Sequence, residues 1–288
     1  MELTNELNIA PHLFVNALEL SRPWTARARF ANSISSLLVG ELPLGRYFAA
    51  GKACKRDGTP PSAIEESMAD WFETDLNPFW TILSSVPDLA EVAAMFDSLN
   101  VSSEQAFEMN LSHWKRAVSK NGDGFETTRV SLDRFEDPEA CLLVSLANTD
   151  AIARAVLIGQ RRRAPPSFAA VADKLGVGAS AAGEVARVLE SEGRMPVSSV
   201  ARILGCNQRT LQRQLKAEGL TAEAIRQACM LVWASNRLRD DASLTEIAMD
   251  AGYFDLAHMN RAFRTACGIP PSALRRSAIG SVKVAAAA

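Results

Sequence analysis

The sequence lacks the features that mark membrane proteins, secreted proteins and disulfide-bonded proteins. Hydrophobic residues make up 48% of its 288 residues, yet no run of about 18 of them occurs, so we expect no membrane-spanning helix. The N-terminal stretch MELTNELNIAPHLF has neither the basic start nor the apolar core of a secretory signal. The cysteines form no CxxC pair, which indicates reduced thiols in a cytoplasm. They are Cys54, Cys141, Cys206, Cys229 and Cys267.

Metal-binding and common catalytic motifs are also missing. The three histidines, His12, His113 and His258, stand far apart, which argues against a histidine-built metal site. The sequence contains no GxSxG, HExxH, P-loop or GxGxxG motif. We therefore expect neither an enzyme nor a cofactor. One alternative stays open: the basic neighbours of Cys54 in GKACKRDG could lower the pKa of its thiol and make it a nucleophile. An ordinary surface cysteine in a basic turn fits the same residues.

Two other charged clusters fit solvated helix surfaces better than sites. Asp70, Glu73 and Asp75 interleave with aromatic residues, as acidic residues on an exposed helix face do. The run Arg161–Arg163 could touch phosphate, but a solvated helix end accounts for it as well. Neither cluster is expected to carry chemistry.

The charge is distributed unevenly along the chain. From residue 194 onward there are 13 Lys and Arg against 7 Asp and Glu, a net charge of +6. The remaining residues carry 18 against 26, a net charge of −8. A basic C-terminal part behind an acidic front half is typical of a chain whose C-terminal part meets a polyanion.

The first half predicts an α+β domain with a small sheet. Apolar residues recur at helical spacing in several segments, and two later segments have the alternation or the apolar content of strands. The predicted helices are 11–20, 24–38, 62–76, 89–99 and 103–120, and the predicted strands lie within 125–135 and 140–147. Pro165-Pro166 then marks a boundary, because a helix cannot run through it.

Residues 168–193 resemble the segment that follows them. AVADKLGV aligns with SVARILGC, so that Ala172 matches Ala201 and Gly176 matches Gly205. The later part of this segment has an apolar stripe of Val185, Val188 and Leu189, which predicts a packing or dimerisation helix. A degenerate copy of the motif described next and a coincidence between two Ala-rich helix pairs are both consistent with the alignment.

The segment PVSSVARILGCNQRTLQRQLKAEG predicts a helix-turn-helix. Val200, Ala201 and Leu204 share one helical face, and Gly205 is suited to end that helix. Asn207 is a good N-cap for a second helix, whose buried positions would be Leu211 and Leu215. Arg suits guanine and Gln suits adenine in the major groove, so the exposed face suits DNA, although it could also be an ordinary solvated face. That face carries Gln208, Arg209, Gln212, Arg213 and Lys216.

The pattern occurs a second time in SLTEIAMDAGYFDLAHMNRAFRTACG. Here Gly252 would form the turn, Asp255 would cap the second helix, and Met259 and Phe263 would be buried. The exposed set is Leu256, His258, Asn260, Arg261 and Arg264. Between the two motifs we expect one helix of about 20 residues, about 30 Å long. Such a rod would place two reading helices over successive major grooves, which lie about 34 Å apart.

Over residues 197–277 the chain resembles the AraC/XylS family of bacterial transcription regulators. The resemblance rests on VARILGCNQRTLQRQLKAEG, on NRLRDDASLTEIAMDAGY and, most specifically, on HMNRAFRTACGIPPSALRR. Residues at the matching positions would then contact DNA: Gln208, Arg209, Gln212, Arg213 and Lys216 on the first helix, and His258, Asn260, Arg261 and Arg264 on the second. Leu274 departs from the Tyr usual in the family, which we expect to be tolerated.

Leu256 and Ala257 stand where the family is often polar. We therefore expect weaker base reading by the second helix, with phosphate contacts through Arg261 and Arg264. The front half is similar in outline to the helical-plus-sheet sensor domain of one branch of the family.

The sequence thus predicts a mainly α protein in three parts: a sensing and dimerisation domain (1–163), connecting helices (164–193) and a DNA-binding domain with two helix-turn-helix motifs joined by a long helix (194–288). Its partners would be double-stranded DNA, a small-molecule effector at an unknown site, RNA polymerase if it activates, and a second copy of the chain, in a bacterial cytoplasm and at the nucleoid. Alternative functions are a DNA-binding repressor or architectural protein without a ligand, and an enzyme fused to a DNA-binding domain.

Overall fold

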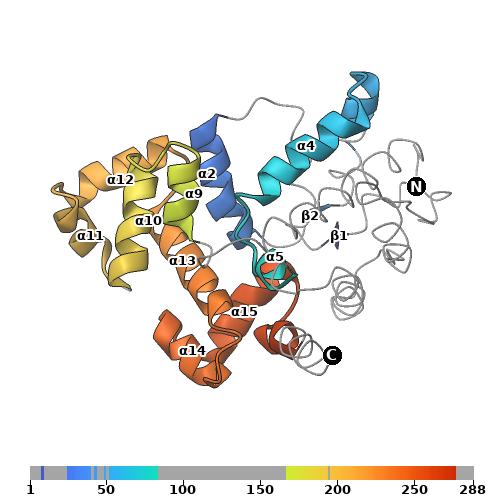
Figure 1. The fold of residues 1–288 in the computed structure, drawn as a ribbon. Helices are drawn as coiled ribbons and strands as arrows, with labels where there is room; N and C mark the ends of the chain where they lie inside the picture. Colours follow the sequence, from blue (N-terminus) through green and yellow to red (C-terminus); the bar gives the residue numbers. More distant parts are fainter. Residues whose placement is uncertain are drawn as a thin grey trace.

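The computed structural model describes residues 8–9, 25–39, 42–43, 49, 52–83, 167–193 and 195–276. These parts are almost entirely helical (Figure 1). Two short strands, β1 (Asn8–Ile9) and β2 (Leu42–Pro43), pair antiparallel. The strands predicted within 125–135 and 140–147 lie outside the described residues, as do the helices predicted at 11–20, 89–99 and 103–120 and the run Arg161–Arg163. Within the described residues no helix is long and apolar enough to span a bilayer.

The described residues of the front half include three bounded α-helices, a short 3₁₀ helix and further helical residues at 49 and 52–56. The bounded helices are α2 (Ala26–Ser35), η3 (Ser36–Leu38), α4 (Pro61–Phe72) and α5 (Pro78–Leu83). The helix predicted over 24–38 is confirmed, with Thr25 as its N-cap. The helix predicted over 62–76 ends four residues early, and Asp75, predicted to be solvated, is only 4% exposed. Its carboxylate accepts a hydrogen bond from the Asn77 N–H at 2.9 Å, which gives this buried group a partner.

The described residues of the back half form three helix pairs, one long helix and a last helical segment at 271–276. The pairs are α9 (Phe168–Lys174) with α10 (Ala181–Glu192), α11 (Val197–Ile203) with α12 (Gln208–Ala217), and α14 (Leu244–Ala251) with α15 (Leu256–Cys267). The long helix α13 (Ala222–Asn236) joins the second pair to the third.

All three helix pairs turn in the same way. A glycine with positive φ follows the first helix, at 68° for Gly176, 68° for Gly205 and 91° for Gly252. The N–H of the residue after this glycine donates a hydrogen bond of 2.8–2.9 Å to the carbonyl of an alanine in the first helix. That alanine is at most 1% exposed. The three alanines are Ala172, Ala201 and Ala248. The structure therefore contains the same helix-turn-helix turn three times, which favours the interpretation of α9–α10 as a degenerate copy.

The α10 helix packs inside the chain. Its stripe of Val185, Val188 and Leu189 is at most 8% exposed, and the helix packs against α9 and α13. The predicted packing role is confirmed, whereas this stripe is not available to a second copy of the chain. Glu190 on the same helix accepts hydrogen bonds from the N–H groups of Phe168 and Ala169. Burial raises the pKa of its carboxyl group, and these two hydrogen bonds oppose that rise.

The front and back halves share one hydrophobic core. The helices α2 and α5 pack on α13, while η3 and α5 pack on α15 (Figure 1). Phe30 of α2 meets Phe168 of α9 edge to face, with ring centroids 6.4 Å apart. An ion pair between Lys174 and Glu73 joins the same two halves. The described front-half helices thus lie directly on the elements that carry the two helix-turn-helix motifs.

Candidate nucleic-acid interface

The second helix of the first motif, α12, has one buried and one exposed face. Asn207 caps it, because its side chain accepts a hydrogen bond from the Thr210 N–H at 2.8 Å. Leu211 and Leu215 are at most 1% exposed and anchor the helix to the core. The five side chains predicted to read DNA are all exposed: Gln208, Arg209, Gln212, Arg213 and Lys216. The five side chains are thus exposed as predicted, while their contact with DNA stays a prediction.

The second helix of the second motif, α15, is built in the same way. Asp255 caps it by accepting from the His258 N–H at 2.6 Å, and Met259 and Phe263 are fully buried. Arg261 and Arg264 are exposed as predicted. The other members of the predicted exposed set are half-buried: Leu256, His258 and Asn260.

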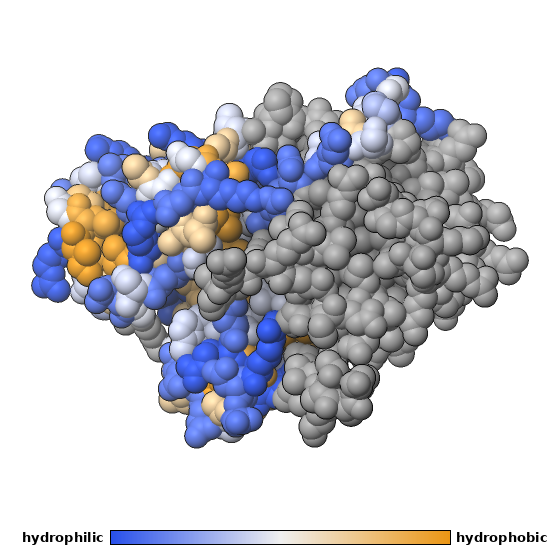
Figure 2. All heavy atoms as spheres, in the orientation of Figure 1, coloured by the Kyte–Doolittle hydropathy of each residue, from blue (hydrophilic) through white to orange (hydrophobic). Residues whose placement is uncertain are grey.

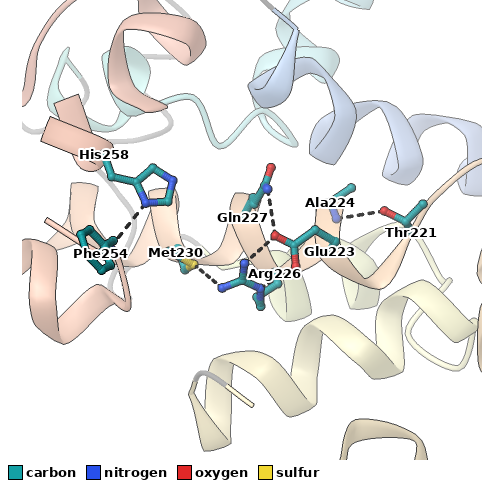
Figure 3. Close-up of polar contacts among 8 residues, drawn as sticks. All are labelled: Thr221, Glu223, Ala224, Arg226, Gln227, Met230, Phe254 and His258. Carbon is teal, nitrogen blue, oxygen red and sulfur yellow. Dashed lines mark hydrogen bonds and ion pairs between the residues drawn. The ribbon is translucent and has the colours of Figure 1, made fainter. Parts of the chain in front are cut away.

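His258 has a structural contact that the sequence did not indicate. Its ring meets Tyr253 edge to face at 5.2 Å. Its Nδ1 accepts a hydrogen bond from the Phe254 N–H at 3.4 Å (Figure 3). The predicted exposure of His258 was wrong, because its ring supports the turn that precedes α15.

The two reading helices match position by position when counted from their caps. At the fifth, sixth and ninth positions after the cap, Gln212, Arg213 and Lys216 of α12 correspond to Asn260, Arg261 and Arg264 of α15. At the first and second positions, Gln208 and Arg209 correspond to Leu256 and Ala257. The polar half of the surface is thus present in both copies, and the two copies differ in the first turn.

None of the arginines and lysines on these two faces forms an ion pair with a described carboxylate. The described ion pairs of the back half lie elsewhere, for example between Arg226 and Glu223 on α13 (Figure 3). The charges of Arg209, Arg213, Lys216, Arg261 and Arg264 therefore face solvent without local neutralisation by the described chain. Such a surface attracts a polyanion.

The first reading helix is tied to α10 through Glu218. The two carboxylate oxygens of Glu218, at the C-cap of α12, each accept one N–H from the start of α10 at 3.0 Å; the donors are Ala181 and Ala182. A carboxylate at a helix N-terminus satisfies amides that have no partner within the helix. Sequence reasoning missed Glu218, because its partners lie more than 30 residues away along the chain.

The second reading helix is tied to the front half through Asn77. The side chain of Asn77 is fully buried, and its Nδ2 donates to the Ala266 carbonyl in the last turn of α15 at 2.8 Å. Its Oδ1 accepts the Phe79 N–H at 3.0 Å, at the start of α5. Asn before Pro is a recognisable helix-start signal, but nothing in the sequence pairs it with a residue 189 positions later.

The family's C-terminal signature also has a structural role here. Arg275 donates through Nε to the Leu238 carbonyl at 2.9 Å, which joins the residues after α15 to those after α13. Leu274, the departure from the usual Tyr, is fully buried. The expectation that an apolar side chain would fit at this position agrees with that burial.

The helix between the motifs is shorter than predicted. It spans 15 residues, Ala222–Asn236, or about 22 Å at 1.5 Å per residue. The helix ends at Asn236, with Arg237 as its C-cap, so the expected rod of about 20 residues was wrong. The separation of the exposed faces of α12 and α15 therefore depends on helix packing as well as on the length of α13: α12 packs against α10 and α11, and α15 packs against α13.

Comparison with known proteins identifies this part of the chain. Residues 200–277 match the family model of a helix-turn-helix domain, of the AraC type. No curated protein and no solved structure matches the chain. Residues 200–277 therefore form a helix-turn-helix domain of the AraC type, and this domain supports a DNA-binding transcription regulator.

The candidate nucleophile Cys54 does not have the surroundings of a reactive thiol. Its side chain is 5% exposed. Burial, followed by the nearby charge of Asp57, raises the pKa of its thiol above the ordinary value. Burial thus opposes the activation by basic neighbours that the sequence suggested. Among the described residues, no group of three or more potential ligands is placed to hold a metal ion.

Proposed function

We propose that the regulator reads two adjacent major grooves with α12 and α15, and that the front half controls this reading. The observation that carries the proposal is the position-by-position match of the two exposed faces behind the same turn. A single Gln- and Arg-rich helix face has an ordinary solvated explanation. A second face repeats the pattern, with Asn260, Arg261 and Arg264 at the positions of Gln212, Arg213 and Lys216. Packing of the core does not require polar side chains at these positions, so the repetition favours a shared function.

Within each face we assign two roles by position. Side chains in the first two turns enter the groove deepest, so Arg209, Gln212 and Arg213 contact base edges. Side chains in the last turn, Lys216 and Arg264, face the phosphate backbone and position the protein without reading sequence.

Control by the front half is supported by the contacts that cross between the halves. The buried amide of Asn77 reaches the last turn of α15, and Arg239, just after α13, donates to the Thr81 carbonyl in α5 at 3.3 Å. A shift of α5 on binding an effector or a partner protein would act on both elements. The family resemblance implies a small-molecule effector, RNA polymerase as the partner of an activator, and a homodimer. A dimer would use a surface other than the buried stripe of α10.

We keep the three-part division at 1–163, 164–193 and 194–288 as the working domain boundaries. The second candidate function is a repressor or architectural protein without a small ligand. It would use the same DNA surface, and it differs in one observable: its DNA site and affinity are the same with and without metabolites.

The test is a selection from random double-stranded oligonucleotides at one near-physiological salt concentration. The intact protein is expected to enrich a site with two half-sites about one helical turn apart. Arg213→Ala is expected to lose the preference in one half-site, and Arg261→Ala in the other. Enrichment of one half-site alone would reject reading by both helices, and enrichment of no motif would reject sequence-specific binding altogether.

A further inference from the structure

The first turn of α15 is apolar where that of α12 is polar. At the second position after the cap, Ala257 is exposed where α12 has Arg209. At the first position, Leu256 replaces Gln208 and is half-buried against the core. Hydrogen bonds to base edges through these two positions are therefore possible for α12 and impossible for α15.

Phe254 extends this apolar surface beyond the helix. It lies one residue before the cap Asp255 and is 83% exposed, more than any other large hydrophobic side chain in the described part of the chain. Its backbone N–H is held by Nδ1 of His258 at 3.4 Å (Figure 3). The exposed side chain of Phe254 is not stabilised by packing in the core. The backbone of Phe254 is nevertheless held in place just before α15.

The exposed positions around α15 follow one another at helical spacing. Ala257, Arg261 and Arg264 are separated by four and three residues, which places them on one face. Phe254 precedes the extended cap Asp255 and so lies outside the helix, next to its N-terminal end; this is the end that leads into the groove in helix-turn-helix proteins. Ala257 and the two arginines thus share one face of α15, and Phe254 stands at the N-terminal end of the same helix.

The major groove has one apolar feature, the C5 methyl group of thymine. We propose that Phe254 and Ala257 contact thymine methyl groups, so that the half-site read by α15 is recognised by its thymines and that read by α12 by hydrogen bonds. This inference rests on the proposed function, because it assumes that α15 lies in a major groove. It replaces the expectation that the apolar first turn makes α15 a weak reader.

A protein-docking role suits Phe254 less well. The arginines of the same face, Arg261 and Arg264, are both exposed. The nearby carboxylate of Asp255 already accepts the His258 N–H. A large exposed apolar side chain at the start of a helix whose exposed face carries arginines matches a surface of DNA that offers methyl groups next to phosphates.

The experiment replaces thymine by deoxyuridine, which lacks only the C5 methyl group. The intact protein first selects its site from the random library, and the thymines of each half-site are then replaced one at a time. The half-site assigned to α15 is the one whose preference Arg261→Ala loses. Burial of one methyl group corresponds to about a fourfold change in affinity. We therefore expect about fourfold weaker binding for at least one substitution in this half-site.

Protein variants link the effect to the two side chains. The deoxyuridine penalty is the ratio of the affinity for thymine-containing DNA to the affinity for the deoxyuridine-substituted DNA. In Phe254→Ala this ratio is expected to fall from about four toward one, because the methyl group no longer has a side chain to contact. Met249→Ala is the matched control, since Met249 is a 58% exposed apolar side chain of the same motif outside the reading face. Its deoxyuridine penalty is expected to stay at the wild-type value. Ala257→Arg, which copies Arg209, is expected to change the preferred base at one position from thymine to guanine.

The outcomes separate this inference from the proposed function. A penalty confined to the α15 half-site and removed by Phe254→Ala supports the methyl contact. A two-half-site motif with no deoxyuridine penalty in the α15 half-site, or with a penalty that Phe254→Ala and Ala257→Arg both leave unchanged, overturns it while two-groove reading stands. If no motif is enriched, the proposed function and this inference fall together.

Discussion

At the scale of single residues, Arg209 and Arg264 carry the same charge at different positions of their helices. Arg209 lies at the second position after its cap and Arg264 at the ninth. We expect Arg209→Ala to cost about 1–3 kcal/mol of binding to the selected site and to relax the preference at one base pair. Arg264→Ala should weaken binding to all sequences alike and reduce the salt dependence by about one phosphate contact. Titrations against specific and scrambled DNA at several salt concentrations measure both effects. Equal losses on every sequence for both variants would show that the two roles were assigned wrongly.

The cysteines provide a second residue-scale test. Cys54, Cys229 and Cys267 are buried, and burial raises the pKa of each thiol, to about 12 for Cys267. Cys206, next to the turn glycine of the first motif, is half-buried. Because the thiolate is the reactive form, we expect Cys206 to react with a disulfide reagent at pH 8 before the other three. Single-cysteine variants allow the rates to be compared. Faster reaction at Cys54 than at Cys206 would restore the catalytic alternative for the front half.

At the scale of elements, the sequence could predict whatever depends on neighbouring residues. The glycine turns, the caps Asn207 and Asp255, and the buried pairs of α12 and α15 follow from local pattern, and the structure confirms them. The length of α13 could not be predicted, because its end at Asn236 follows an apolar, helix-compatible sequence. The contacts of Glu218 and Asn77 could not be predicted from the sequence either. Each one joins a polar side chain to a helix end that is distant along the chain, and only the tertiary fold brings the two together.

Asn77 provides the prediction at this scale. In Asn77→Ala the Ala266 carbonyl and the Phe79 N–H lose their side-chain partner inside the core. We expect the free energy of unfolding to fall by about 1–3 kcal/mol. Urea titration followed by circular dichroism measures it. Gln227→Ala is the control, because Gln227 is exposed and its hydrogen bond to Glu223 is open to solvent, so we expect a change within about 0.5 kcal/mol. Equal effects for the two variants would mean that the Asn77 contact does not join the halves.

At the scale of the whole molecule, the helices of the front half and of the connecting segment complete the core of the DNA-binding part. The helices α2 and α5 cover α13, and α10 packs along it while Glu218 binds the start of α10. A fragment beginning at residue 194 would expose those faces of α13 and leave Glu218 without its partners. A fragment beginning at residue 167 keeps α9 and α10 and loses only the front half.

We therefore expect stability to fall from the intact chain to 167–288 and again to 194–288. Each step removes apolar contacts worth about 25 cal/mol per Å² of buried surface. Urea unfolding of the three proteins, with DNA binding measured in parallel, tests this order. Equal stability of the two fragments would place the boundary of the DNA-binding unit at residue 194, as the basic charge of that segment suggested. A fragment 167–288 as stable as the intact chain would remove the mechanical basis for control by the front half, because α5 would then contribute nothing to holding α15.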